Sequence, residues 1–120
     1  MIELLSEYPD NVVALRGHSK VTGEDYERDL IPAIEEKLKL HKKIRMLYHL
    51  GGDFSGYTAA AMWDDAKVGL QHLTAFEKIA VVTDTHWVSE AVKVFGYFIP
   101  CPVRTYDNNQ LTEAKAWICE

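Results

Sequence analysis

The chain has 120 residues, of which 48% are hydrophobic and 26% charged, a composition typical of a folded globular domain rather than a disordered segment. Its net charge is −5 and its acidic residues are spread along the chain, so no basic face is available to bind a nucleic-acid backbone. No apolar stretch approaches the roughly 20 residues of a membrane-spanning helix. We therefore expect a single domain over residues 1–120 that is neither a nucleic-acid-binding nor an integral membrane protein.

The N-terminal segment and the cysteines predict the compartment. Residues 1–7 include Glu3 and Glu7 and lack the basic start of a signal peptide. Cys101 and Cys119 are then two free thiols in a reducing environment rather than a disulfide. These features predict a cytoplasmic protein.

In the first third of the chain, a hairpin of two strands is expected over residues 2–7 and 11–16, followed by a loop over residues 17–21. Thr22 and Asp25 then form a capping box at the start of a helix, and Pro32 should kink or break that helix. The apolar residues at helical spacing on its buried face are Tyr26, Leu30, Ala33, Ile34 and Leu38.

The middle of the chain predicts a strand, a loop and a helix in succession. Residues 44–50 are nearly all apolar, as in a strand covered on both faces, and a glycine-rich loop over residues 51–56 follows. The buried stripe expected on the next helix is Ala59, Met62, Trp63, Ala66, Leu70 and Leu73. The residues expected outside that stripe are Asp64, Asp65, Lys67 and Gln71.

The last third predicts another strand–helix pair and a final strand and helix. A central strand over residues 79–82 precedes a helix that Asp84 or Thr85 caps and that ends at Gly96. Its apolar residues are Val88, Ala91, Val92 and Phe95. A short strand over residues 103–106 leads to a helix that Asn109 caps. This helix presents Leu111, Ala114, Trp117 and Ile118.

The resulting order, ββαβαβαβα, predicts an α/β fold with a mixed, largely parallel sheet of about five strands and about four helices. The carboxyl ends of parallel strands meet at one edge of a sheet, so the segments 17–20, 51–56 and 84–87 should cluster there. A glycine-rich loop that opens a helix offers unpaired amides and a positive dipole end, which suit an anion. The candidate ligand-binding residues are Gly52, Asp53, Phe54, Ser55, Gly56, Tyr57, Asp84, Thr85, His86 and Trp87.

Motifs along nearly the whole chain resemble one known family. They are Thr22-x-Glu24-Asp25-Tyr26, Ile31-Pro32-Ala33, Trp63-Asp64-Asp65 with Gly69-Leu70-x-His72, Glu77-Lys78-Ile79-Ala80-Val81-Val82-x-Asp84-x-x-Trp87, and Val103-Arg104 with Glu113-Ala114-x-Ala116-Trp117. The chain resembles the STAS domain and, more closely, the small bacterial SpoIIAA-like proteins, which are also grouped with Sec14-type lipid-binding domains. The resemblance implies a STAS/SpoIIAA-like fold, whereas the function of this family is itself poorly defined.

The resemblance also implies a candidate phosphorylation site. In anti-anti-sigma STAS proteins, a serine in an Asp-Ser-Ser-Gly motif opens the helix after the third strand and is phosphorylated. Asp53-Phe54-Ser55-Gly56 is similar, with Phe54 in place of the first serine, and Ser55 matches the phosphorylated position. A phosphate there adds about −1.5 to −2 charges and would change a docking surface. The alternative is that Ser55 is a plain helix cap.

Other chemistries lack a specific pattern. The five histidines do not have the spacing of a metal site, and Gly51-Gly52 matches neither a Walker loop nor a dinucleotide fingerprint. Cys101 lies between two prolines and Ser55 is not in a nucleophile elbow. Acid–base pairing of His18 or His86 with Asp53 or Asp84 is the one catalytic arrangement that the predicted edge allows. We predict no catalytic residue, no metal and no cofactor.

Aromatic residues suggest binding instead. The run over residues 95–100, with Phe54, Tyr57 and Trp87, can line a cavity for a hydrophobic ligand, or it can be satellite core packing or a homodimer contact. Trp63 and Trp117 lie on helical stripes and are expected in the core. The function predicted first is a non-catalytic cytoplasmic module that binds a small apolar or anionic ligand at the loop edge. The alternative is a protein-interaction switch, with a regulatory protein partner, controlled by phosphorylation of Ser55.

Overall fold

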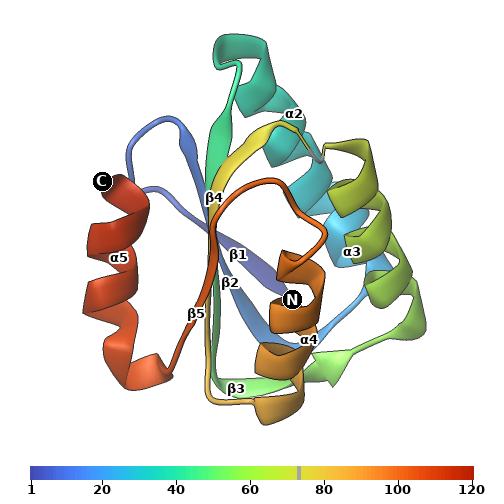
Figure 1. The fold of residues 1–120 in the computed structure, drawn as a ribbon. Coiled ribbons are helices and arrows are strands. Elements are labelled where there is room, and N and C mark those ends of the chain that lie inside the picture. Colours follow the sequence, from blue (N-terminus) through green and yellow to red (C-terminus); the bar gives the residue numbers. More distant parts are fainter. Residues whose placement is uncertain (73) are drawn as a thin grey trace.

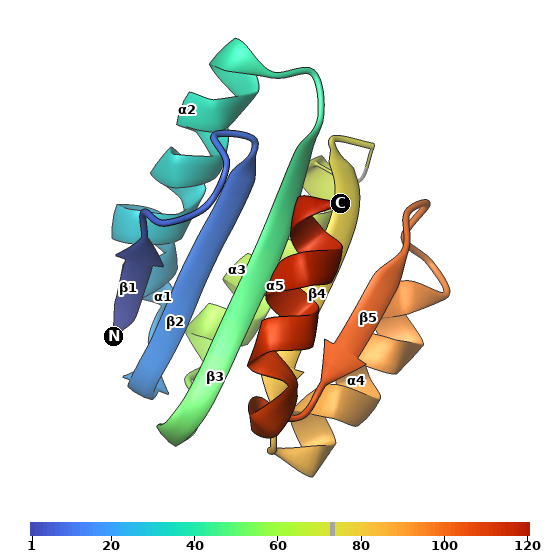
Figure 2. The same cartoon turned by 90° about the vertical axis from the view of Figure 1, so that its left-hand side faces the viewer.

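The computed structural model describes residues 1–72 and 74–120, apart from the side chains at positions 65, 66 and 68–70. Its five strands form one sheet in the order β1 to β5 (Figures 1 and 2). The strands are β1 (Ile2–Leu5), β2 (Val12–Val21), β3 (Ile44–Tyr57), β4 (Phe76–Thr83) and β5 (Val103–Tyr106). β1 is antiparallel to β2 and every other pair is parallel, which confirms the predicted mixed, largely parallel sheet.

The helices cover both faces of this sheet. They are α1 (Gly23–Asp25), the π-helix η1 (Tyr26–Leu30), α2 (Ile31–Leu40), α3 (Ala59–Gln71), α4 (His86–Gly96), the 3₁₀ turn η2 (Asn108–Gln110) and α5 (Leu111–Cys119). α1 to α4 lie on one face and α5 lies alone on the other (Figures 1 and 2). None of the helices, over the described residues, is long and apolar enough to span a membrane.

Alternation along the strands divides the core into two halves. Val13 and Leu15 of β2 belong to the larger cluster, under α1 to α4, whereas Val12 and Ala14 belong to a smaller cluster under α5. This period of two is what a strand buried on both faces requires. Trp117 is a buried member of the smaller cluster, as predicted from its place on a helical stripe.

The first helix confirms the predicted capping box and shows how the chain accommodates Pro32. The Thr22 hydroxyl accepts a hydrogen bond from the Asp25 amide at 3.2 Å, and the Asp25 carboxylate accepts one from the Thr22 amide at 2.9 Å. Pro32 has no amide to donate, and the helix widens into the π-turn η1 before it, in which the Ile31 amide reaches the Tyr26 carbonyl. The predicted break is therefore one wide turn within a continuous helical segment.

Two predicted loops are strand in the structure. β2 continues through residues 17–21 and β3 continues through residues 51–57, and the two extensions pair with each other at Ser19–Phe54, Lys20–Gly56 and Val21–Tyr57. Register shifts in β2 on both sides of Ser19 accompany this pairing, and Ser19 has a positive φ of 52°. The prediction of a glycine-rich loop that opens a helix is therefore wrong, because the extensions satisfy each other's backbone groups.

The predicted orientation of α3 is also wrong. Met62 and Trp63 are 55% and 67% exposed and Ala59 is exposed, whereas Ala61 and Asp64 are buried. Lys67 and Gln71 are exposed, as expected. The predictions for Asp65, Ala66 and Leu70 concern side chains outside the described residues, and Leu73 is outside them altogether.

The physical reason lies in the packing of α1 against α3. A Cβ added at Gly23 of α1 would come within 2.8 Å of the Ala60 Cβ and 3.2 Å of an Asp64 carboxylate oxygen. α1 thus crosses α3 at this turn, where Ala60 and Asp64 face it. The larger Met62 and Trp63 are exposed to solvent. A pattern of apolar residues does not predict that an aspartate such as Asp64 is buried.

Two corrections concern the last two helices. Phe95, predicted on the buried face of α4, is 52% exposed. Asp107, and not Asn109, occupies the N-cap position of the turn before α5, where the Gln110 side-chain oxygen accepts the Asp107 amide at 2.9 Å and the Gln110 amide donates to the Asp107 carbonyl at 2.9 Å. α4 ends at Gly96 as predicted.

Candidate functional site

An aromatic cluster lies where β3 ends and α4 begins. The rings of Phe54 and Tyr57, both on β3, are 5.1 Å apart, and the rings of Tyr57 and Trp87 are 6.0 Å apart. Both pairs meet edge to face, an arrangement that stabilises aromatic contacts. Phe54 and Tyr57 are half-buried against the larger core cluster, and Trp87 is 49% exposed. The structure therefore brings together three predicted site residues from two sequence segments.

His18 of β2 binds two carboxylates on the neighbouring strands. Its Nδ1 lies 2.6 Å from an Asp53 oxygen and its Nε2 lies 2.8 Å from a Glu3 oxygen, so three neighbouring strands are joined. Hydrogen bonds to Asp53 and then to Glu3 raise the pKa of His18, and the bond from His18 lowers the pKa of Asp53. Arg16 adds a longer contact to Asp53, at 3.6 Å. Asp53 directly precedes Phe54, so this clasp (Glu3, His18 and Asp53) fixes the strand segment that carries the aromatic ring.

The predicted pairing of a histidine with a carboxylate is therefore present for His18 and Asp53. Glu3 was missed, because only the antiparallel register of β1 on β2, with Glu3 opposite Arg16, brings it near His18. His86 does not join the clasp: its side chain is 88% exposed and its carboxylate neighbour is Glu90, at 3.8 Å.

The starts of the two helices near the site differ. The hydroxyl of Thr58 accepts the Ala61 amide at 3.1 Å and so caps α3. Thr85 occupies the N-cap position of α4, yet its side chain makes no capping hydrogen bond. Asp84 does not cap α4 either, because its carboxylate accepts the Asn108 amide at 2.9 Å. Neither Thr85 nor Asp84, in the part of the chain that the structure describes, therefore caps the first amides of α4, which include that of Trp87.

Ser55 and its neighbouring glycines lie on the β3 extension. Ser55 is exposed, three residues before the Thr58 cap, so it neither opens nor caps a helix. A side chain at Gly52 would meet no atom within 4 Å, so the backbone is open there. Gly56 has a φ of 144°, a conformation that residues with a side chain rarely adopt.

Other titratable groups do not form a reaction centre among the described residues. No group of three or more His, Cys, Asp or Glu side chains in that part of the chain is placed to hold a metal ion. His49 is buried, and desolvation, followed by the charge of Arg16, lowers its pKa. Cys101 and Cys119 are free, and burial raises the pKa of the Cys101 thiol, which disfavours the reactive thiolate.

Sequence reasoning also missed part of the exposed apolar surface. Met62 and Trp63 of α3 lie on the same side of the sheet as α4 (Figure 1) and are exposed, although the pattern placed them in the core. Within α3, five apolar residues in a row, from Ala59 to Trp63, gave no local signal for the orientation of the helix.

Comparisons with known proteins agree with this architecture. The model of the SpoIIAA-like family matches residues 12–119, and the chain belongs to this family. The chain is similar to the crystal structure of an uncharacterised protein with a SpoIIAA-like fold from Shewanella loihica PV-4. The TM-score is 0.77 at 27% sequence identity, over 98% of this chain and 93% of that chain. No curated protein matches the sequence.

Proposed function

We propose that this protein is a non-catalytic binding module whose ligand lies on the aromatic cluster of Phe54, Tyr57 and Trp87. The observation that carries the proposal is the half-exposed state of these three rings at the carboxyl ends of β3 and β4. Ligand sites of parallel α/β sheets lie at this edge and combine apolar walls with a few polar groups. The rings supply the apolar walls.

The polar group next to these walls is the start of α4. Trp87 is the second residue of the helix, so its ring and the uncapped first-turn amides lie at one place. Those amides and the positive end of the helix dipole favour a negatively charged or strongly polar group. A ligand with an anionic head and an apolar tail matches both features. Cytoplasmic location, predicted from the sequence, fits such a ligand.

The clasp supports binding rather than catalysis. Both ring nitrogens of His18 are engaged by carboxylates, at 2.6 and 2.8 Å, and the same carboxylates favour the protonated ring. A doubly hydrogen-bonded imidazolium has no free nitrogen to accept a proton from a substrate. The clasp is better suited to holding the β3 extension and its Phe54 ring in place.

The second candidate is a phosphorylation switch at Ser55. Exposure of Ser55 favours access by a kinase. Its place on a strand removes the helix amides that would hold the phosphate, which is why we rank this function second. A phosphate on Ser55, found by mass spectrometry of protein from its own host, would reverse this ranking.

The ligand proposal is tested on protein purified without detergent or added lipid. A native mass spectrum should show additional non-covalent mass that leaves on collisional activation. The affinity for an apolar anionic probe, 1-anilinonaphthalene-8-sulfonate, should fall roughly five- to thirtyfold in Trp87→Ala, because an aromatic anchor contributes about 1–2 kcal/mol.

Leu40→Ala is the control, because Leu40 is a 74% exposed apolar residue at the end of α2, outside the aromatic cluster. It should leave the affinity for the probe unchanged. A clean apo mass together with equal affinities for wild type and Trp87→Ala would refute the proposed site.

A further inference from the structure

The C-terminal end of α4 and the turn that follows it carry a second exposed apolar surface. Val94, Phe95, Tyr97 and Phe98 are 58%, 52%, 88% and 76% exposed, and we call these four residues the α4 patch. With about 150–250 Å² for each aromatic ring, its three aromatic side chains leave roughly 300–550 Å² uncovered. The largest apolar patch of a typical monomer measures about 300–600 Å² and often has a function. Val94, the patch residue nearest to Trp87 along the chain, lies seven residues after it on α4, about 10 Å or two helical turns away, so the patch is separate from the Trp87 ring.

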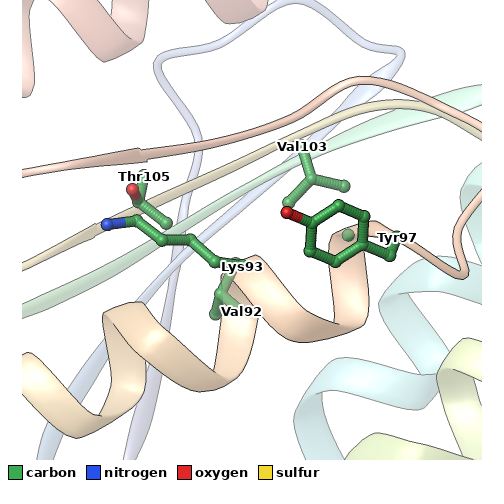
Figure 3. Close-up of a pocket in the computed structure, with 6 residues that line it drawn as sticks. Val92, Lys93, Tyr97, Val103 and Thr105 are labelled. Atoms are coloured by element: carbon green, nitrogen blue, oxygen red, sulfur yellow. The ribbon is translucent and has the colours of Figure 1, made fainter.

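A hollow lies next to this patch, between α4 and β5 (Figure 3). It has a volume of about 380 Å³ and is lined by Val92, Lys93, Gly96, Tyr97, Val103 and Thr105. Lys93 of α4 and Tyr97 of the turn after it extend toward β5, and Val103 and Thr105 extend from β5 toward α4 (Figure 3). The exposed Phe98 directly follows Tyr97, which lines this open, partly apolar hollow, so the two features are neighbours in the chain. Such a surface can match a rotated copy of itself.

The strand beside the hollow is also open. β5 is the last strand of the sheet, and its outer edge pairs with no strand in the described part of the chain (Figure 2). Two identical β5 edges can pair in the antiparallel direction across a twofold axis, because each offers the same donors and acceptors. Four residues supply few hydrogen bonds, so the apolar side chains must provide most of the binding energy.

Charge does not oppose contact between two copies here. The chain has a net charge of −5, which disfavours self-association at an arbitrary surface. On α4, however, Glu90 and Lys93 pair with each other at 3.7 Å, so their charges cancel beside the patch. Across a twofold axis, Glu90 of each copy can instead pair with Lys93 of the other copy, and the charges still cancel.

We propose that the α4 patch, the hollow and the β5 edge form the interface of a symmetric homodimer, with a second copy of this chain as the occupant. A stable interface needs about 800 Å² from each partner. The exposed aromatic area supplies roughly half of it, and the hollow and the β5 backbone supply the rest. In this dimer, Phe98 of each copy enters the hollow of the other.

The experiment is sedimentation equilibrium of the full chain from low micromolar to several hundred micromolar. The wild type should shift from 13.7 kDa to twice that mass with concentration. Phe98→Asp should raise the dimer dissociation constant at least about tenfold, as expected for an aromatic anchor. Leu40→Asp is the matched control, because Leu40 is 74% exposed at the end of α2 and receives the same charge; it should dimerise like the wild type.

A second measurement needs no variant. Hydrogen exchange at the amides of β5 should slow as the wild-type concentration rises, whereas exchange in β1, at the other edge of the sheet, should not change. A wild type that remains monomeric throughout overturns the proposal. So does a dimer that Phe98→Asp leaves intact, or one whose formation leaves β5 exchange unchanged, since a different surface then forms the contact.

Discussion

Replacing Gly23 by alanine tests the close packing of α1 on α3. The added Cβ would lie 2.8 Å from the Ala60 Cβ, whereas carbon atoms in contact prefer about 3.5–4.0 Å. Both atoms are attached directly to helix backbones, so no side-chain rotation relieves the overlap, and one helix must move. Overpacking of this kind costs about 1–3 kcal/mol.

Alanine also has a better helix propensity than glycine, by up to about 1 kcal/mol. The expected net loss for Gly23→Ala is therefore about 1–2 kcal/mol in the free energy of unfolding, which corresponds to a Tm lower by roughly 3–10 °C for a domain of this size. Urea unfolding followed by circular dichroism gives the free energy directly.

Two further variants make the result specific. Gly52→Ala should retain wild-type stability or gain slightly, because no atom lies within 4 Å of the added Cβ. The double variant Gly23→Ala/Ala60→Gly should be more stable than the sum of the two single effects, since removing the Ala60 Cβ removes the overlap. A Gly23→Ala protein as stable as the wild type would refute the close crossing of α1 and α3.

Two other predictions concern the clasp and the tryptophans. Asp53 and Glu3 raise the pKa of His18 in the folded protein. The stabilisation that protonated His18 provides is therefore fully present below pH 6.5, the ordinary pKa of histidine, and is lost as the pH rises through the folded pKa. The urea concentration at which half of the protein is unfolded should therefore be lower at pH 8.5 than at pH 5.5, as measured by unfolding curves at the two pH values. In His18→Gln, most of this difference should be absent. An equal decrease in both proteins would contradict the prediction. Trp117→Ala should cost about 3–5 kcal/mol because its ring is buried under Lys78 and Arg104, whereas Trp63→Ala should change the free energy of unfolding by no more than about 0.5 kcal/mol. Equal losses would mean that both rings lie in the core.

The sequence was informative where local chemistry decides the structure. The capping box at Thr22, the end of α4 at Gly96 and the buried stripe of α5 depend on residues within a few positions of each other, and all three were predictable. Loops at the carboxyl ends of the strands were expected to meet because topology requires it. Segments 17–20 and 51–56 do meet, as paired strands rather than loops (Ser19 with Phe54), and Tyr57, just after the second segment, contacts Trp87.

The errors arose where distant segments decide the structure. The pairing of the β2 and β3 extensions depends on a partner more than thirty residues away, for example Ser19 with Phe54, and glycines alone suggested a loop. That error shifted the expected start of the next helix from Ala59 back toward Ser55. The orientation of α3 was then decided by Gly23 of α1, another distant contact that no local pattern encodes.

The distribution of aromatic residues separates stability from binding. Tyr26, Tyr48, Phe76 and Trp117 are buried, so the folded state depends on them and tolerates little change there. Trp87, Tyr97 and Phe98 are largely exposed, and removing them leaves the core intact. An exposed aromatic ring stabilises a monomer little, so the rings near the two ends of α4 are the places proposed above for a ligand and for a second copy of the chain. The ring cluster at the start of α4 fits a small ligand with a polar head. The broader patch at the other end, beside an open strand, fits a surface as large as another copy of the chain.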